Sequence, residues 1–120
     1  MSKKSRDARR IEIVKRLVHL DGGGPSLFID MLREFGWDYN GAPYLLTRGD
    51  VSNILERYLD GEMNSEELEA WADAIELRED IQYEEENEEW IKDVIYILAS
   101  TDLNGPITLE KVKGLLNQSR

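Results

Sequence analysis

Three segments of the sequence repeat the same signal for the start of a helix. In each, an apolar residue precedes a Thr or Asn, and a second apolar residue follows that polar residue by four positions, at residues 46–51, 63–68 and 107–112. Thr and Asn can cap the free N–H groups of a first helical turn, while the two apolar residues pack on each other. The first two segments add an acid that can close a capping box. Such a chain is constrained to be mainly helical.

Apolar residues recur at helical spacing through most of the chain and predict six helices. The expected ranges are residues 7–20, 26–35, 48–60, 65–80 and 84–100, with a short sixth helix after residue 108. Gly36 and Gly61 fit as terminators of the second and third helices, and Trp71 and Trp90 are expected in the core. The stretch 36–46 reads as irregular, and no segment alternates as a strand does. We therefore predict an all-α, single-domain bundle of about five to six helices.

Length and composition fit one globular domain. The 120 residues can bury a single core but are short for two. We expect a flexible basic N-terminus over residues 1–6 and a single helical domain over residues 7–120. The sequence has no cysteine and no apolar run long enough to span a membrane, so a cytoplasmic location is the default expectation.

Residue types that catalyse reactions or bind metals are scarce. With one histidine and no cysteine, the sequence offers no zinc site and no histidine-based triad. His19 ends the first expected helix, where a cap or surface role is favoured. The glycines at 22–24 lack the lysine of a phosphate loop, and residues 100–111 lack the end ligands of a calcium loop. No catalytic residue, metal or cofactor is expected; an acid–base enzyme would need a pocket that raises a carboxyl pKa.

Charge is distributed unevenly along the chain. Residues 1–20 contain seven Lys/Arg and two Asp/Glu, whereas residues 60–89 contain fourteen Asp/Glu and one Arg. Most acids of the fourth and fifth helices fall opposite the apolar positions. Like charges three or four residues apart destabilise a helix by roughly 0.2–0.5 kcal/mol per pair, and the helix dipole offsets this only in the first turn. A face kept acidic in this way favours a basic binding partner; a face that only maintains solubility is the alternative.

The residues predicted to contact that partner lie on the outward faces of the fourth and fifth helices. They are Glu69, Asp73, Glu76, Asp80, Glu85, Glu89, Asp93 and Tyr96. The tyrosine is included because tyrosine is enriched in binding hot spots. A face of this sign repels the phosphates of nucleic acids and attracts basic proteins. We therefore expect a basic protein partner, and neither nucleic acid nor a membrane.

The stretch YLDGEMNSEEL at residues 58–68 resembles the colicin D immunity-like family of small acidic bacterial proteins. The matching positions are Tyr58, Leu59, Gly61, Glu66 and Glu67. They place a glycine turn between an amphipathic helix and a capped, acid-rich helix. The resemblance implies a helical, cytosolic, non-enzymatic inhibitor that neutralises a toxin domain, commonly a basic nuclease. It would do so with carboxylates that mimic phosphate.

A second class of function is a helical adaptor or regulatory subunit. Such a protein would bind its partner through an apolar groove, and the aromatic residues Trp37, Tyr39 and Tyr44 are the candidates for its lining. Binding of this kind survives high salt, because it depends on apolar burial more than on charge. Salt dependence therefore separates the adaptor from the inhibitor.

Overall fold

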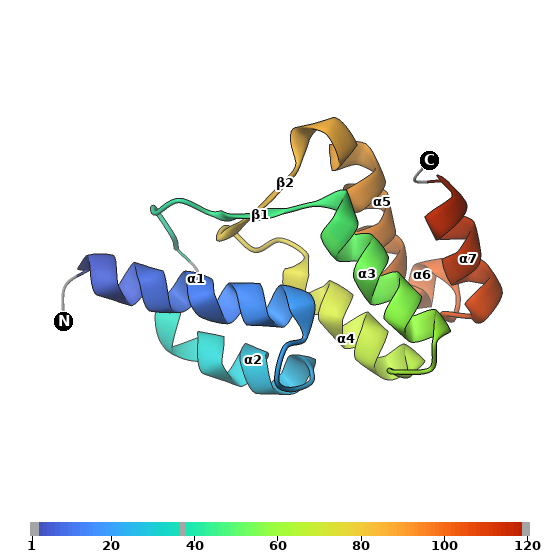
Figure 1. Ribbon diagram of the computed structural model, residues 1–120, viewed down its shortest axis with the longest axis horizontal. Helices are drawn as coiled ribbons and strands as arrows, with labels where there is room; N and C mark the ends of the chain where they lie inside the picture. Colours follow the sequence, from blue (N-terminus) through green and yellow to red (C-terminus); the bar gives the residue numbers. More distant parts are fainter. Residues whose placement is uncertain (1–2, 37, 119–120) are drawn as a thin grey trace.

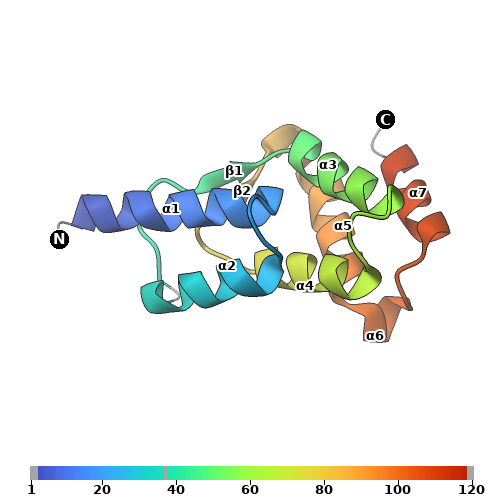
Figure 2. The ribbon, with the colours of Figure 1, turned by 60° about the horizontal axis from the view of Figure 1, so that its bottom comes forward.

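Helices make up most of the chain. The computed structural model describes residues 3–36 and 38–118. Its helices are α1 (Lys3–His19), α2 (Pro25–Leu32), the 3-10 turn η1 (Arg33–Phe35), α3 (Arg48–Leu59), α4 (Ser65–Ile75), the 3-10 turn η2 (Glu85–Asn87), α5 (Glu88–Ala99), α6 (Thr101–Asn104) and α7 (Leu109–Gln118). Helices α1 and α2 lie side by side at one end of the molecule, and α3, α5 and α7 lie at the other (Figure 1 and Figure 2). Because α4 contacts both α2 and α5, it joins the two ends.

A short parallel sheet interrupts the helical chain. Strand β1 (Tyr44–Leu46) pairs with strand β2 (Ile81–Tyr83), and Tyr44 lies opposite Ile81. The all-α prediction is therefore right for most of the chain and wrong for these two segments. Each strand has only three residues, which is too short for an alternating pattern to be visible in the sequence.

The predicted helix starts are confirmed by the hydrogen bonds at their caps. At the start of α3, Thr47 Oγ1 accepts the Asp50 N–H at 3.1 Å, and the Asp50 carboxylate accepts the Thr47 N–H at 3.2 Å. The start of α4 has the same two bonds, at 2.8 and 3.1 Å. At the third start, Thr108 Oγ1 accepts the Lys111 N–H at 3.1 Å. The third cap has only this one bond, because the lysine side chain has no oxygen that could accept the N–H group of Thr108.

Several predicted helix ends are wrong. Helix α4 ends at Ile75 instead of residue 80, because Glu76 takes an extended ψ of 132° and Leu77 a φ of +66°. Helix α5 begins at residue 88, after η2, instead of at 84. Helix α1 already begins at Lys3 instead of at residue 7. The expected flexibility of residues 1–6 stays a prediction, and residues 1 and 2 lie outside the described residues.

The part of the chain that the structure describes contains seven α-helices instead of five or six. The additional one, α6, is a four-residue segment after α5. None of these helices is both long and apolar enough to cross a membrane.

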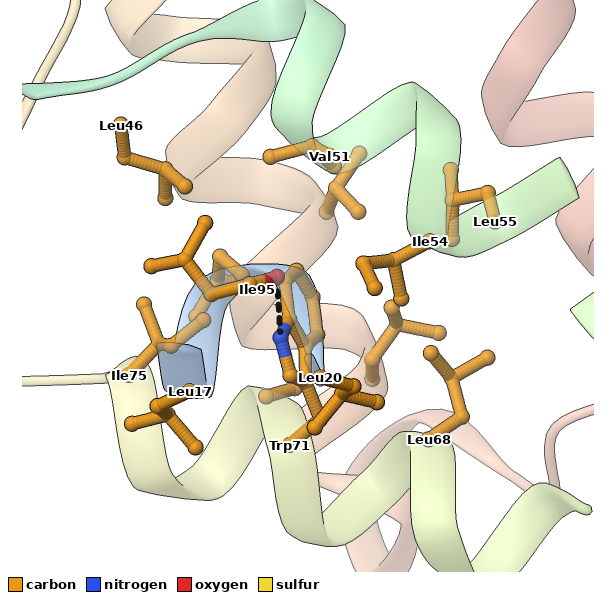
Figure 3. Close-up of a cluster of buried hydrophobic side chains, with 14 of the residues drawn as sticks. Leu17, Leu20, Leu46, Val51, Ile54, Leu55, Leu68, Trp71, Ile75 and Ile95 are labelled. Carbon is orange, nitrogen blue, oxygen red and sulfur yellow. Dashed lines mark hydrogen bonds between the residues drawn. The ribbon is translucent and has the colours of Figure 1, made fainter. Parts of the chain in front are cut away.

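The core is centred on Trp71, which side chains from α1, α3, α4 and α5 surround (Figure 3). Its Nε1 donates to the carbonyl oxygen of Val18 at 3.2 Å, and an Arg57 nitrogen donates to the next carbonyl oxygen, that of His19, at 2.7 Å. A helix leaves its last carbonyls without partners within the helix. Trp71 and Arg57 therefore supply the hydrogen bonds that the last carbonyl oxygens of α1 lack. Trp90, also expected in the core, is only partly buried.

Candidate partner-binding site

A groove of about 500 Å³ lies between the end of α4, strand β2 and helix α5. Its lining residues are Glu76, Leu77, Arg78, Ile81, Tyr83, Glu88, Lys92, Asp93, Ile95 and Tyr96. Apolar and aromatic side chains from all three segments are thus joined by three carboxylates. Burial and the nearby Glu76 carboxylate raise the pKa of Tyr83, because each disfavours its ionised form. The groove combines apolar surface with negative charge.

Leu77 is the most unusual residue of this groove. Its φ of +66° lies in the left-handed region, which costs a residue with a side chain roughly 1–2 kcal/mol. Its side chain is also 88% exposed, so folding gains little from burying it. The turn at Leu77 lets Asp80 reach Arg10, but it leaves the leucine side chain in solvent. Backbone strain of this kind clusters at binding sites, and we take Leu77 as a contact residue.

Three of the eight predicted contact residues line this groove. They are Glu76 at the end of α4, together with Asp93 and Tyr96 on α5. Tyr96 is 45% exposed. Glu89 precedes Asp93 by one helical turn and is also exposed, so it extends the same stripe of α5. The sequence pattern thus predicted acids near the end of α4 and on α5, and the fold brings Glu76 and Asp93 together at the groove.

The remaining acids of α4 continue from the groove along the helix. The hydroxyl of Thr101, which follows α5, donates to the Glu69 carboxylate, so the start of α4 lies near the end of α5. The two helices are therefore antiparallel, and Asp73 falls between Glu69 and the groove. We name the carboxylates of Glu69, Asp73, Glu76, Glu89 and Asp93 the acidic ridge.

Glu85 lies away from the groove. It belongs to η2 and, with Glu89, lines a second hollow that Trp90 and Gln118 border. This hollow is at the opposite end of α5 from Tyr96. Glu89 lies in this hollow and also one helical turn from Asp93, whereas Glu85 lies only in the hollow and is left out of the acidic ridge.

Asp80 corrects the sequence prediction most clearly. It was expected on the outward face of the fourth helix, but its side chain is 0% exposed. Arg10 Nε donates to Asp80 Oδ2 at 2.8 Å, and Arg78 Nε donates to Oδ1 at 2.7 Å. Burial raises the pKa of Asp80, but the hydrogen bonds from Arg78 and Arg10 outweigh it and hold the pKa below its usual value. A buried, charged carboxylate cannot meet a partner on the surface.

Arg10, which pairs with Asp80, also supports the wall of the groove that residues 78–83 form. Arg10 is 4% exposed, donates to the Asp38 carbonyl oxygen at 3.0 Å, and lies over the Tyr39 ring at 4.7 Å from its centre. The Asp80 carbonyl oxygen in turn accepts the Tyr44 N–H at 2.8 Å, next to the strand pair. This network sets the position of the wall formed by residues 78–83.

A second polar cluster joins α1, β1 and α3. His19 Nε2 lies 3.1 Å from Asp50 Oδ1 and 3.3 Å from the Tyr44 hydroxyl, which donates to Asp50 Oδ2 at 3.0 Å. Burial and the Asp50 carboxylate hold the pKa of Tyr44 well above its usual range, which opposes a role for it as a base. Because Asp50 also serves as the α3 cap, we interpret the cluster as a structural link.

The aromatic residues proposed for an adaptor groove have other roles in the described structure. Tyr39 stacks on Arg10, and Tyr44 belongs to the histidine cluster. Trp37 lies outside the described residues. Among the described residues, an apolar groove does lie at Leu77 and Tyr96, beside the acids of α5.

Sequence reasoning missed Leu77, Ile81 and Tyr83 as groove residues. One signal pointed to the first of them, because Leu77 is an apolar residue among the outward acids of the expected fourth helix. The other two were assigned to a break between helices. Their position in a strand depends on pairing with β1, more than thirty residues earlier.

Within residues 3–36 and 38–118, no group of three His, Asp or Glu side chains is arranged to hold a metal ion. Comparison of the chain with protein-family models, with curated proteins and with solved structures finds no match. The groove and the acidic ridge therefore have to be interpreted from their own geometry and charge.

Proposed function

We propose that this chain is a non-enzymatic binding protein that holds a basic partner protein against the groove and the acidic ridge. The specific form that we propose is an immunity-type inhibitor, which neutralises a basic toxin or nuclease domain. The observation that carries this proposal is the groove itself, where the strained and exposed Leu77 lies beside three carboxylates. The groove places an exposed apolar side chain next to negative charge.

The charge balance of the groove favours a basic partner. Arg78 is one of its two cations, and one edge of its guanidinium group, formed by Nε and Nη2, donates to Asp80 at 2.7 and 2.9 Å. The groove therefore has two cations, Arg78 and Lys92, against three carboxylates, those of Glu76, Glu88 and Asp93. A surface of net negative potential speeds the encounter with a basic protein and rejects acidic ones.

The proposal of an immunity-type inhibitor is supported by the positive charge that a nuclease active site needs in order to bind phosphates. Proteins that bind nucleic acid present Lys and Arg to its phosphates. The carboxylates of the acidic ridge carry the same sign of charge as those phosphates, so they can occupy the same cationic surface. Apolar contact at Leu77 and Tyr96 would add affinity that salt does not screen.

The charge requirement is tested with the double variant Glu76→Gln, Asp93→Asn. We expect its affinity for a catalytically inactive toxin nuclease domain, taken from the neighbouring gene where that gene encodes one, to fall roughly tenfold, because each lost rim charge contributes up to ~1 kcal/mol. The dependence of affinity on salt should also become shallower. Titration calorimetry at two salt concentrations measures both quantities.

The matched control is Glu12→Gln, Asp21→Asn, which removes two exposed acids of the same types near α1. It changes the net charge equally and should leave affinity within twofold. Equal losses in the two double variants would show a general charge effect and overturn the groove as the site. Unchanged affinity and salt dependence in the groove variant, with binding retained, would favour the adaptor.

Leu77→Gly separates binding from folding. Glycine adopts positive φ without strain, so the free energy of unfolding should stay unchanged or rise by up to ~1 kcal/mol. Affinity for the same nuclease domain should nevertheless fall roughly tenfold, because an apolar contact is lost. Urea denaturation and titration calorimetry provide the two measurements.

Leu27→Ala is the control, because Leu27 is another exposed leucine, on α2 and outside the groove. It should bind like the unmodified protein. If Leu77→Gly binds with full affinity, Leu77 is not a contact residue. If that variant is strongly destabilised, the left-handed backbone is not the source of strain described above.

A further inference from the structure

Strand β2 has an edge that β1 does not cover. The Tyr44 N–H donates to the Asp80 carbonyl oxygen at 2.8 Å, and the Glu84 N–H donates to the Leu46 carbonyl oxygen at 2.9 Å. In a parallel pair, a residue bonds to the two neighbours of the residue opposite to it. The backbone groups of residues 80, 82 and 84 therefore face β1. Those of Ile81 and Tyr83 face the other way.

This outer edge runs along the groove. Ile81 and Tyr83 both line the groove, between Leu77 before the strand and Tyr96 on α5. Within the described residues, β2 pairs with no strand other than β1. The edge thus presents two N–H groups and two carbonyl oxygens beside apolar surface.

The two strands of the sheet differ in the residues and helices that lie next to them. Pro43 precedes β1, and α1 contacts that strand, whereas α5 contacts β2. Natural proteins protect exposed edges with proline, with lysine inside the strand or by covering the edge, because an open edge invites another strand. Strand β2 contains neither residue in its sequence IQY. Its open edge is therefore a suitable place for β-strand addition.

We propose that the partner enters the groove as an extended segment and adds a third strand to the outer edge of β2. Its backbone bonds to Ile81 and Tyr83, and its side chains alternate between apolar and basic. The apolar ones lie against Leu77 and Tyr96. The basic ones meet the carboxylates of Glu76 and Asp93. This inference rests on the proposed function and adds how the partner is recognised.

The chemistry of the segment follows from the groove. Strand addition obtains affinity from backbone hydrogen bonds and specificity from alternate side chains. The three carboxylates of the groove outnumber its two cations, so a segment with Lys or Arg at every second position is complementary to them. A helical segment would satisfy its own backbone groups and leave the β2 edge unused.

Amide hydrogen exchange of the free protein tests the open edge. The N–H groups of Gln82 and Glu84 bond to β1 and should exchange at least roughly tenfold more slowly than those of Ile81 and Tyr83. This alternation is resolved residue by residue in NMR spectra. Equal protection of all four amides would mean that the edge is already covered, and it would overturn the inference.

A synthetic peptide tests strand addition itself. The probe is a seven-residue peptide of alternating lysine and valine, added to ¹⁵N-labelled protein. We expect saturable shifts of the Ile81 and Tyr83 amides, together with at least roughly tenfold slower exchange of both. One comparison peptide carries methyl groups on its backbone nitrogens, and a second has the same composition with its lysines and valines in separate blocks. Both should bind at least roughly tenfold more weakly.

The outcomes separate this inference from the proposed function. If the methylated peptide binds equally well, or the two amides stay unprotected while α5 signals shift, strand addition is wrong but the acidic groove still binds a basic segment. If no peptide binds, the inference is overturned, and the nuclease-domain measurements decide the function separately. Protection of both amides that is lost in Glu76→Gln, Asp93→Asn supports both proposals together.

Discussion

Replacing Asp80 with asparagine is expected to lower the free energy of unfolding by about 3–5 kcal/mol. Arg10 is 4% exposed and has its ion pair with this carboxylate, so the variant leaves a buried guanidinium group without its counter-charge. Arg78 loses its partner as well. The loss is a large share of the stability of an ordinary domain. Urea denaturation of the variant and the unmodified protein measures it.

The pH dependence of stability identifies the charge as the cause. The folded-state pKa of Asp80 lies below its unfolded value, so its contribution is complete above about pH 4–5 and is lost as pH falls through the folded pKa. Asp80→Asn should lack this part of the acid-induced loss. Asp73→Asn, which changes an exposed aspartate of α4, should stay within ~0.5 kcal/mol at neutral pH. A loss below ~1 kcal/mol in Asp80→Asn would contradict the buried ion pair.

Trp71→Ala is the second substitution expected to have a large effect, with a loss of about 3–5 kcal/mol. The side chain is fully buried, and its removal leaves a cavity where α1, α3, α4 and α5 meet (Figure 3). The hydrogen bond to the Val18 carbonyl oxygen is lost at the same time. Thermal and urea denaturation of the variant give the change in stability.

Trp71→Phe divides this loss into its parts. Phenylalanine keeps much of the buried volume but cannot donate to Val18, so this variant should lose about 1–3 kcal/mol, less than Trp71→Ala. If Phe and Ala destabilise equally, the hydrogen bond dominates and the packing contribution is small. If Trp71→Ala loses less than ~1 kcal/mol, this tryptophan is not the centre of the core.

The features that the sequence predicted well are those encoded over four or five neighbouring residues. The Thr47 cap and its partner Asp50 are three positions apart, and both of their bonds are present. The inward positions of α4 and α5 follow from a spacing of three and four residues, and Trp71 lies where that spacing places it. Local rules suffice because the interacting groups belong to one helical turn.

The features that the sequence did not predict depend on residues far apart in the chain. The end of α4 at Ile75 allows Asp80 to turn inward, toward an arginine 70 positions earlier. Local charge patterning placed the same aspartate on the surface, because a carboxylate among other carboxylates looks like part of a soluble face. The groove was likewise hidden, since β2 exists only through its pairing with β1.

We expect the bond between Arg10 and Asp80 to influence when the groove can form during folding. Closing a loop of that length is slow compared with forming a helical turn or a connection between adjacent helices. A three-residue strand has no stability by itself, so β2 takes its place only after both ends of this long loop have met. Asp80 lies 70 positions after Arg10, so this ion pair cannot form until residue 80 has been synthesised. We therefore expect the wall of the groove that β2 forms to be completed late in folding.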